Sequence, residues 1–172
     1  MKKFATFSLI ILTLTFSAFA QKKTIVIKTD PAKDVRAVFD RLIEGIKQSD
    51  AAKVMSVYDK NADIFFFNNN GSVTRGWETM KINREESYKT VTNVTIEPTG
   101  VNVQMLGKDA AYLTCKWKQR QEYKGKLESA SGRMTLVFKL IGKDWKIVHL
   151  HTSPDNPDAT RPVLDSERIK QP

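Results

Sequence analysis

The stretch Trp145-Lys146-Ile147-Val148-His149-Leu150-His151-Thr152-Ser153 is the most informative segment of this 172-residue chain. Its aromatic and β-branched residues predict a strand at 144–152. Because side chains alternate along a strand, His149 and His151 should project from one face. Apolar residues occupy both faces of this stretch, so the sequence predicts a strand inside a sheet and leaves open which face carries the histidines.

Further strands are expected before this one. Four of them are bounded by glycine or proline turn signals: 91–97, 101–106, 109–120 and 127–141. The aromatic run 64–67 predicts a short buried strand, and the turn signal at 68–71 follows it. Met134, Leu136, Phe138 and Leu140 alternate with a second row of residues, which is typical of a strand with one face in the core: Arg133, Thr135, Val137 and Lys139. The second half of the chain therefore reads as a strand-rich sheet.

Helical spacing dominates the first half of the chain. Asp30 and Pro31 are typical N-cap and N1 residues, and they predict a helix over 31–48. A shorter second helix is expected to start at Ala51. A third helix is expected from Arg75 to about Thr90, with four residues near one stripe: Trp77, Met80, Arg84 and Tyr88. Helices followed by strands predict an α+β fold, with three N-terminal helices packed on a curved antiparallel sheet around a cone-shaped cavity.

The ends of the chain differ from this domain. A basic start, an apolar stretch over 4–16 and the small residues Ala18 and Ala20 predict a signal peptide at 1–20, cleaved before Gln21. A membrane anchor is the alternative, but the apolar run is short for a span. We therefore expect a secreted or periplasmic protein without stable membrane insertion after cleavage. Residues 21–30 form a lead-in with a candidate edge strand at 24–27, residues 31–153 the domain, and residues 154–172 a proline-rich tail.

Composition excludes several classes of protein. The chain is 41% hydrophobic and 27% charged, which fits one globular domain rather than a disordered chain. Its single cysteine excludes a disulfide scaffold, and Cys115 shares the apolar face of its strand, so we expect a core residue and no nucleophile. Without the first twenty residues the net charge is +7. The basic cluster at 116–126 reads as a solvated hairpin face, so no nucleic-acid partner is expected.

Four segments carry a resemblance to a known family. These are the final strand, the stretch 131–135, the segment from Tyr58 to Asp63, and Arg75-Gly76-Trp77-Glu78. Together they resemble the SnoaL-like branch of the NTF2-like superfamily, and members related to the calcium/calmodulin-dependent protein kinase II association domain in particular. The resemblance covers about 32–153. It implies an NTF2-like cone-shaped barrel, commonly dimeric through its sheet, and that superfamily hosts both enzymes and binding modules.

The histidines are the only candidate catalytic residues. His149 or His151 could transfer protons in a lyase or isomerase, although histidines in such strands more often hold the sheet together. A metal site would need a third ligand, so neither a metal nor a cofactor is expected. The resemblance to steroid-isomerase-like members puts Phe66 where they carry a catalytic carboxylate. The resemblance to the kinase association domain puts Thr152 where that domain has an arginine.

A ligand pocket is the preferred interpretation. Its expected walls are aromatic, with Arg133 as a candidate partner for a carboxylate: Tyr58, Phe66, Trp77 and Tyr88. The alternatives are core packing for the aromatic residues and a rim ion pair for Arg133, with Glu128 or Glu78. We therefore expect an exported, homodimeric domain that binds a small, partly apolar ligand, and no catalytic constellation. The alternatives are the lyase or isomerase and a ligand-free assembly domain.

Overall fold

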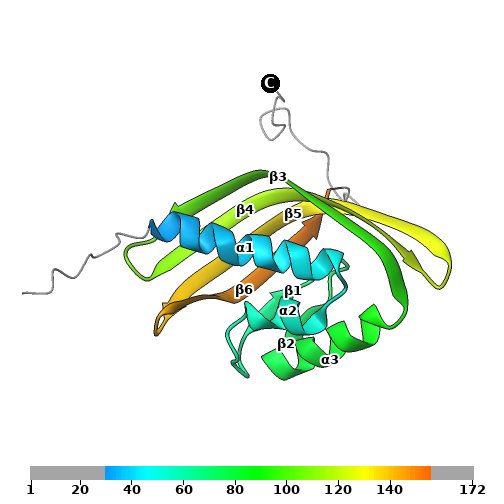
Figure 1. Ribbon diagram of the computed structural model, residues 1–172, viewed down its shortest axis with the longest axis horizontal. Coiled ribbons are helices and arrows are strands. Elements are labelled where there is room, and N and C mark those ends of the chain that lie inside the picture. The colour runs from blue at the N-terminus through cyan, green and yellow to red at the C-terminus, as the bar shows by residue number, and fades with distance from the viewer. Residues whose placement is uncertain (1–29, 156–172) are drawn as a thin grey trace, which may run out of the picture.

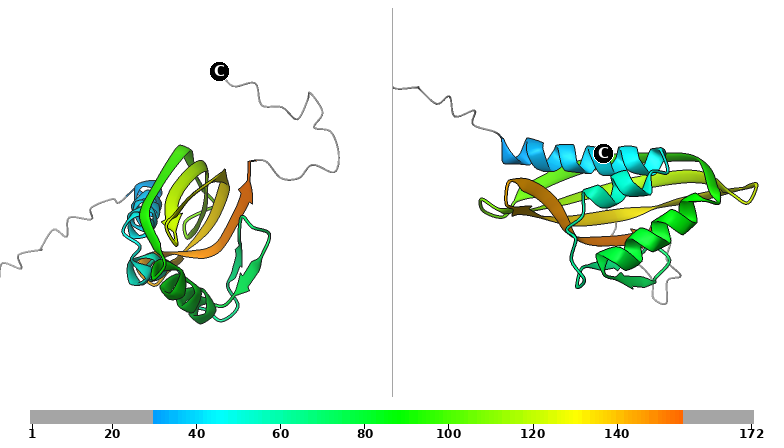
Figure 2. Two further views of the ribbon diagram at one scale, coloured as in Figure 1. Left: turned by 90° about the vertical axis from the view of Figure 1, so that its right-hand side faces the viewer. Right: turned by 60° about the horizontal axis from the view of Figure 1, so that its bottom comes forward.

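Three helices lie on one side of a curved six-stranded sheet in the computed structural model, which describes residues 30–155 (Figure 1; Figure 2). The helices are α1 (Pro31–Lys47), α2 (Ala51–Ser56) and α3 (Trp77–Tyr88). The strands are β1 (Phe65–Phe67), β2 (Val73–Arg75), β3 (Val91–Met105), β4 (Ala110–Tyr123), β5 (Lys126–Ile141) and β6 (Asp144–Pro154). Their order in the sheet is β2-β1-β6-β5-β4-β3. The predicted α+β architecture is confirmed.

The sheet is mixed and unclosed, whereas the sequence predicted an antiparallel one. β1 pairs with β6 in parallel, and the other neighbouring strands pair antiparallel. The reason lies just after α2, where the chain already runs beside β6. Ile147 N donates to Val57 O, and Asp59 N donates to Ile147 O, each over 2.9 Å. This segment sets the direction in which β1 enters the sheet.

Helix α1 forms where the capping signals predicted it. The Asp30 carboxylate accepts a hydrogen bond from Ala32 N at 3.1 Å, and Pro31 occupies the first turn. The apolar stripe of α1 is buried and packs against β3 and α2. Its members are Val35, Val38, Phe39, Leu42, Ile43 and Ile46. Burial of this stripe stabilises the helix more than local propensity does.

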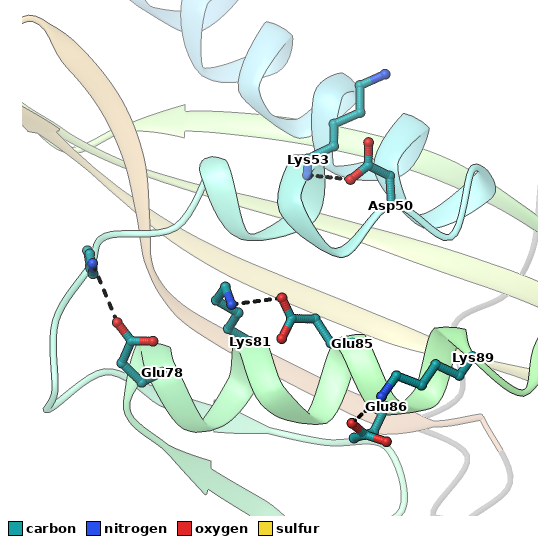
Figure 3. Close-up of polar contacts among 8 residues, drawn as sticks. Asp50, Lys53, Glu78, Lys81, Glu85, Glu86 and Lys89 are labelled. Carbon is teal, nitrogen blue, oxygen red and sulfur yellow. Dashed lines mark hydrogen bonds and ion pairs between the residues drawn. The ribbon is translucent and has the colours of Figure 1, made fainter.

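Helix α2 packs closely on the end of α1. Asp50 caps it by accepting a hydrogen bond from Lys53 N at 2.8 Å (Figure 3). A Cβ atom at Gly45 would lie 2.9 Å from Val54 Cγ2, so only glycine allows this approach of the two helices. The short second helix is therefore fixed by a cap and by a helix–helix contact.

Strand β2 has no counterpart among the predicted strands, and the third helix was expected to start at Arg75, the last residue of β2. Arg75 instead pairs with Phe65 in the β1–β2 hairpin, and its side chain forms an ion pair with Asp63. Gly76 follows with φ +89°, a conformation that ends the strand before α3 begins. The apolar content of 73–75 is too low to predict a strand; the turn at 68–71 holds it against β1.

Strand β3 is continuous where two strands, 91–97 and 101–106, were expected. The turn signals at 98–100 do not end the strand; they bend it, and Gly100 adopts φ +61°. Register shifts against β4 occur between Thr92 and Thr95 and again between Thr99 and Asn102. Such irregularities curve a strand without ending its pairing. The expected break is therefore a bend that wraps the sheet around the helices.

Inner and outer faces alternate along β4 and β5. Trp117 on β4 and Met134, Leu136 and Phe138 on β5 are buried on the inner face. Cys115 is buried beside them, and desolvation raises the pKa of its thiol to about 11, so the predicted core role is confirmed. Lys116, Lys118 and Arg120 are exposed on the outer face. The basic cluster is thus a solvated surface.

A bulge in β6 changes which residues face the core. Ile147 pairs with Phe138 and His149 pairs with Val137, so Val148 is an extra residue between the two pairs. The inward positions are consequently Ile147 and then Leu150, which are both buried. Odd-numbered residues of β6 therefore face the core before the bulge, and even-numbered residues face it after the bulge.

The described residues end just beyond β6. That strand reaches Pro154, one residue past the predicted end of the domain, and Asp155 N donates to Ser131 O at 3.1 Å. The predicted signal peptide, the edge strand at 24–27 and the rest of the tail lie outside the described residues. Within 30–155, no helix is long and apolar enough to cross a membrane.

Candidate functional site

A cavity of about 620 Å³ opens between the inner face of the sheet, helix α3 and the turn after β1. Ile96, Met134 and Leu150 form its apolar floor, and Trp117 adds an indole. The remaining lining is polar or small: Asn68, Asn69, Asn70, Arg84, Gln119, Gln121, Glu128, Ser129, Ala130 and Thr152. Most of the lining is therefore polar, around an apolar floor, and a concave site of this size can hold a small organic ligand.

The polar wall of the cavity comes from the part of the β4–β5 hairpin that lies next to its turn. Gln119 Nε2 donates to Gln121 Oε1 at 2.7 Å, and Gln121 Nε2 donates to the Glu128 carboxylate at 3.0 Å. The three side chains share the inner face because they continue the alternation of Trp117 and Met134. The Glu128 carboxylate is therefore held in a hydrogen-bonded row.

Tyr58 and Phe66, two of the predicted wall residues, lie in the core beneath the cavity and do not line it. Their rings pack edge to face with centroids 5.1 Å apart. Burial raises the pKa of Tyr58 to about 12, opposed by the positive charge of Arg84. Phe66 is fully buried, so the position that resembles a catalytic carboxylate site carries only packing.

Trp77 and Tyr88 hold α3 in place instead of lining the cavity. Trp77 Nε1 donates to Met55 O at 3.0 Å, which ties the start of α3 to α2. The indole also lies 5.1 Å from Lys60 Nζ. The Tyr88 hydroxyl is buried, with no hydrogen-bond partner among the described residues. Both aromatic residues therefore follow the core-packing alternative.

Arg133 lies on the outer face of the sheet, away from the cavity. Its side chain is exposed, and Nη2 donates to Pro154 O at 3.2 Å. The rim ion pairs considered for it do not form, since Glu78 pairs with Lys60 at 3.4 Å and Glu128 lies on the inner face. Arg133 cannot anchor a ligand in this cavity.

His149 and His151 also project from the outer face. They share that face with Phe67, whose ring centroid lies 5.4 Å from that of His149 and 5.6 Å from that of His151. Desolvation lowers the pKa of His149, which favours the neutral imidazole. No group of three metal-ligating side chains occurs within the described part of the chain. The imidazoles are therefore outside the cavity in which a substrate would sit.

Two signals for the true lining were present in the sequence. Arg84 stands four residues from Met80 and from Tyr88, on the inward stripe of α3. Gln119 and Gln121 continue the period-2 pattern of Trp117 along β4. The turn at 68–71 gave no such signal, because only the folded hairpin brings its asparagines to the cavity mouth.

Helices covering the concave side of a curved mixed sheet, with a cavity between the layers, define an NTF2-like domain. The SnoaL-like domain family matches residues 35–157, and the chain belongs to it. No curated protein matches this chain.

Solved structures with the same fold carry diverse descriptions. An NTF2-like superfamily protein from Salmonella enterica is 20% identical, with TM-score 0.67 over 75% of this chain and 94% of that one. A putative dehydratase of the NTF2-like family from Streptomyces avermitilis is 19% identical, with TM-score 0.66 over 74% and 97%. A putative calcium/calmodulin-dependent protein kinase II association domain from Xanthomonas campestris is 20% identical, with TM-score 0.63 over 76% and 91%. These likenesses show the fold, as the resemblance predicted.

Proposed function

We propose that this chain binds a small, partly apolar organic ligand in the inner cavity. The observation that carries the proposal is the lining: Ile96, Met134 and Leu150 offer an apolar floor within a space of about 620 Å³. Pockets for small molecules commonly have this size, and they combine apolar surface that holds the body of the ligand with polar groups that orient it. The fold itself is used by ligand-binding and isomerase-type domains, so the lining rather than the fold supports binding.

Proton-transfer catalysis by a histidine has less support. A general acid or base must come within hydrogen-bonding reach of its substrate, whereas His149 and His151 lie on the opposite face of the sheet. Phe66 is buried and cannot ionise. A lyase or isomerase would have to use Glu128, which already accepts a hydrogen bond from Gln121.

The binding proposal is tested by thermal unfolding of residues 21–172 against a library of small acids, amides and alcohols with apolar bodies. A ligand of the folded state raises the melting temperature as its concentration increases. Ala130→Phe fills the cavity from its lining and should abolish that rise. Ser131→Phe adds the same ring to the next residue, on the outer face, and should preserve it. No rise with any compound would contradict the proposal and favour a ligand-free assembly domain.

We also propose that the protein is exported and that its leader is removed. The support is the sequence of residues 1–20, with its basic start, apolar stretch and small residues before Gln21. Mass spectrometry of the protein from its native host should give an N-terminus at Gln21. Recovery of the intact chain in a membrane fraction would contradict this.

A homodimer through the outer face of the sheet is our proposal for its assembly. Phe65 and Phe67 are each 40% exposed there, and Val73 is 52% exposed. The two phenylalanine rings stack 6.4 Å apart beside His149 and His151. An apolar patch of this kind on a sheet face is better covered by a second copy of the chain than left in water.

A further inference from the structure

Arg84 is the only basic residue among those that line the inner cavity in the described chain. Its side chain is half-buried, and it comes from α3, whereas the apolar floor comes from the sheet. Long charged side chains are seldom withdrawn from water without a partner. The Arg84 guanidinium therefore needs an acceptor for its hydrogen bonds and a partner for its charge.

No acidic side chain of helix α3 is available to Arg84. Glu85 pairs with Lys81 at 2.7 Å, Glu86 pairs with Lys89 at 2.6 Å, and Glu78 pairs with Lys60 at 3.4 Å (Figure 3). Within residues 30–155, no carboxylate lies within ion-pair distance of the Arg84 guanidinium. The ion pairs of α3 therefore exclude Arg84, although the helix is rich in glutamate.

A neutral group lies close enough to sense the charge of Arg84. Its positive charge acts on the Tyr58 hydroxyl, a group that burial keeps protonated. Glu128 is the acidic residue of the lining, but it stands six residues from Met134 along β5. At the rise of a β-strand this separation is about 20 Å, so Glu128 belongs to the outer rim of the cavity and not to its floor. The cavity thus combines an apolar floor with an arginine that has no ion-pair partner among the described residues.

We propose that the ligand of this cavity carries one carboxylate, which pairs with the Arg84 guanidinium while the apolar body of the ligand lies on Ile96, Met134 and Leu150. This inference rests on the proposed binding function. The planar guanidinium matches a carboxylate with two parallel hydrogen bonds. A phosphate monoester carries nearly two charges and would be poorly neutralised by one arginine. A monocarboxylate with an apolar body fits both the charge and the surface.

Calorimetric titration with two matched probes tests the inference. The probes are 4-phenylbutyrate and 4-phenylbutyramide, which share the apolar body and differ in the charge of the head group. Wild-type protein should bind the acid at least tenfold more tightly than the amide. Arg84→Gln should remove that preference by weakening acid binding about tenfold, without affecting the amide. Arg84→Lys should retain part of the preference, because it keeps the charge and loses the paired geometry.

Lys81→Gln provides the matched control. It removes a positive charge from the same helix, but Lys81 pairs with Glu85 and does not line the cavity. This variant should bind both probes as the wild type does, and circular dichroism should show that all three variants are folded. Equal binding of acid and amide, or an acid affinity unchanged by Arg84→Gln, would overturn the carboxylate inference and leave the binding function standing. Failure of both probes and of the wider library would overturn both.

Discussion

Trp117 lies across Gly132, its register partner between β4 and β5. A Cβ atom at position 132 would come within 3.2 Å of Trp117 Cζ2 and would collide with the carbonyl oxygen of Ser153 on β6. The absence of a side chain at this point therefore lets three strands and an indole pack together at the cavity wall.

Gly132→Ala should destabilise the fold for this reason. The added methyl group must push aside either the backbone of Ser153 or the Trp117 ring, and overpacking of this kind costs about 1–3 kcal/mol. Urea denaturation measures the loss in free energy of unfolding. Ser131→Ala, one residue away, is the control and should change stability by less than about 0.5 kcal/mol. Equal stability of Gly132→Ala and the wild type would contradict this, because it would show that β6 or the Trp117 ring moves aside without loss of stability.

Tyr88→Phe should leave stability unchanged or raise it. The Tyr88 hydroxyl is buried without a hydrogen-bond partner in the described chain, and an unsatisfied buried polar group costs about 1–3 kcal/mol. Removing the oxygen relieves that cost and keeps the ring. Tyr112→Phe, on a half-buried outer-face residue, is the comparison. A loss of more than about 1 kcal/mol in Tyr88→Phe would reveal a partner for the hydroxyl.

His149 should make the fold less stable under mildly acidic conditions. Desolvation lowers its pKa below the ordinary 6.5, so the unfolded chain binds a proton more readily than the folded chain does. Its contribution is complete above pH 6.5 and is lost as the pH falls towards the pKa of the folded state. His149→Gln should flatten the melting temperature between pH 7 and pH 5, whereas His151→Gln should keep the slope due to His149. Parallel curves for His149→Gln and the wild type would contradict this.

Phe67→Lys should convert the proposed dimer into single chains. A charge in the middle of the exposed aromatic pair on β1 would have to be buried in the interface. Light scattering at micromolar concentration should give about twice the mass of one chain for the wild type and about one chain mass for the variant. Leu127→Lys alters another exposed apolar residue, at the far hairpin, and should remain dimeric. A wild-type mass of one chain would refute the dimer.

The sequence predicted the secondary structure better than it predicted the site. Capping residues and apolar stripes are local signals, and they located α1, α2 and most of α3. The choice of cavity residues depends on which face of each strand is concave. Val137 opposes Leu136 with similar apolarity, so alternation alone could not exclude Arg133 from the inner face. The sequence places Arg84 on one stripe with Met80 and Tyr88. That Arg84 lacks an ion pair is visible only in the folded structure, because Lys60, Lys81 and Lys89 take the three glutamates of α3.

The two histidines show most clearly what the sequence alone could not predict about the site. Trp145 and Ile147 face the core, and strict alternation from them would carry His149 and His151 inward as well. The extra residue Val148 reverses that outcome. No residue type marks the bulge in the sequence, because the pairing with β5 creates it.

The bulge at Val148 determines which side chains of β6 face the cavity, and therefore which chemistry is possible there. A one-residue slip that paired Val148 with Val137 would turn two imidazoles towards a ligand and Leu150 away from it, with every amino acid unchanged. Among proteins that share this final-strand motif, the histidines alone therefore do not distinguish an enzyme from a binding protein. Transfer of an activity between them requires the register of the last two strands to be compared first.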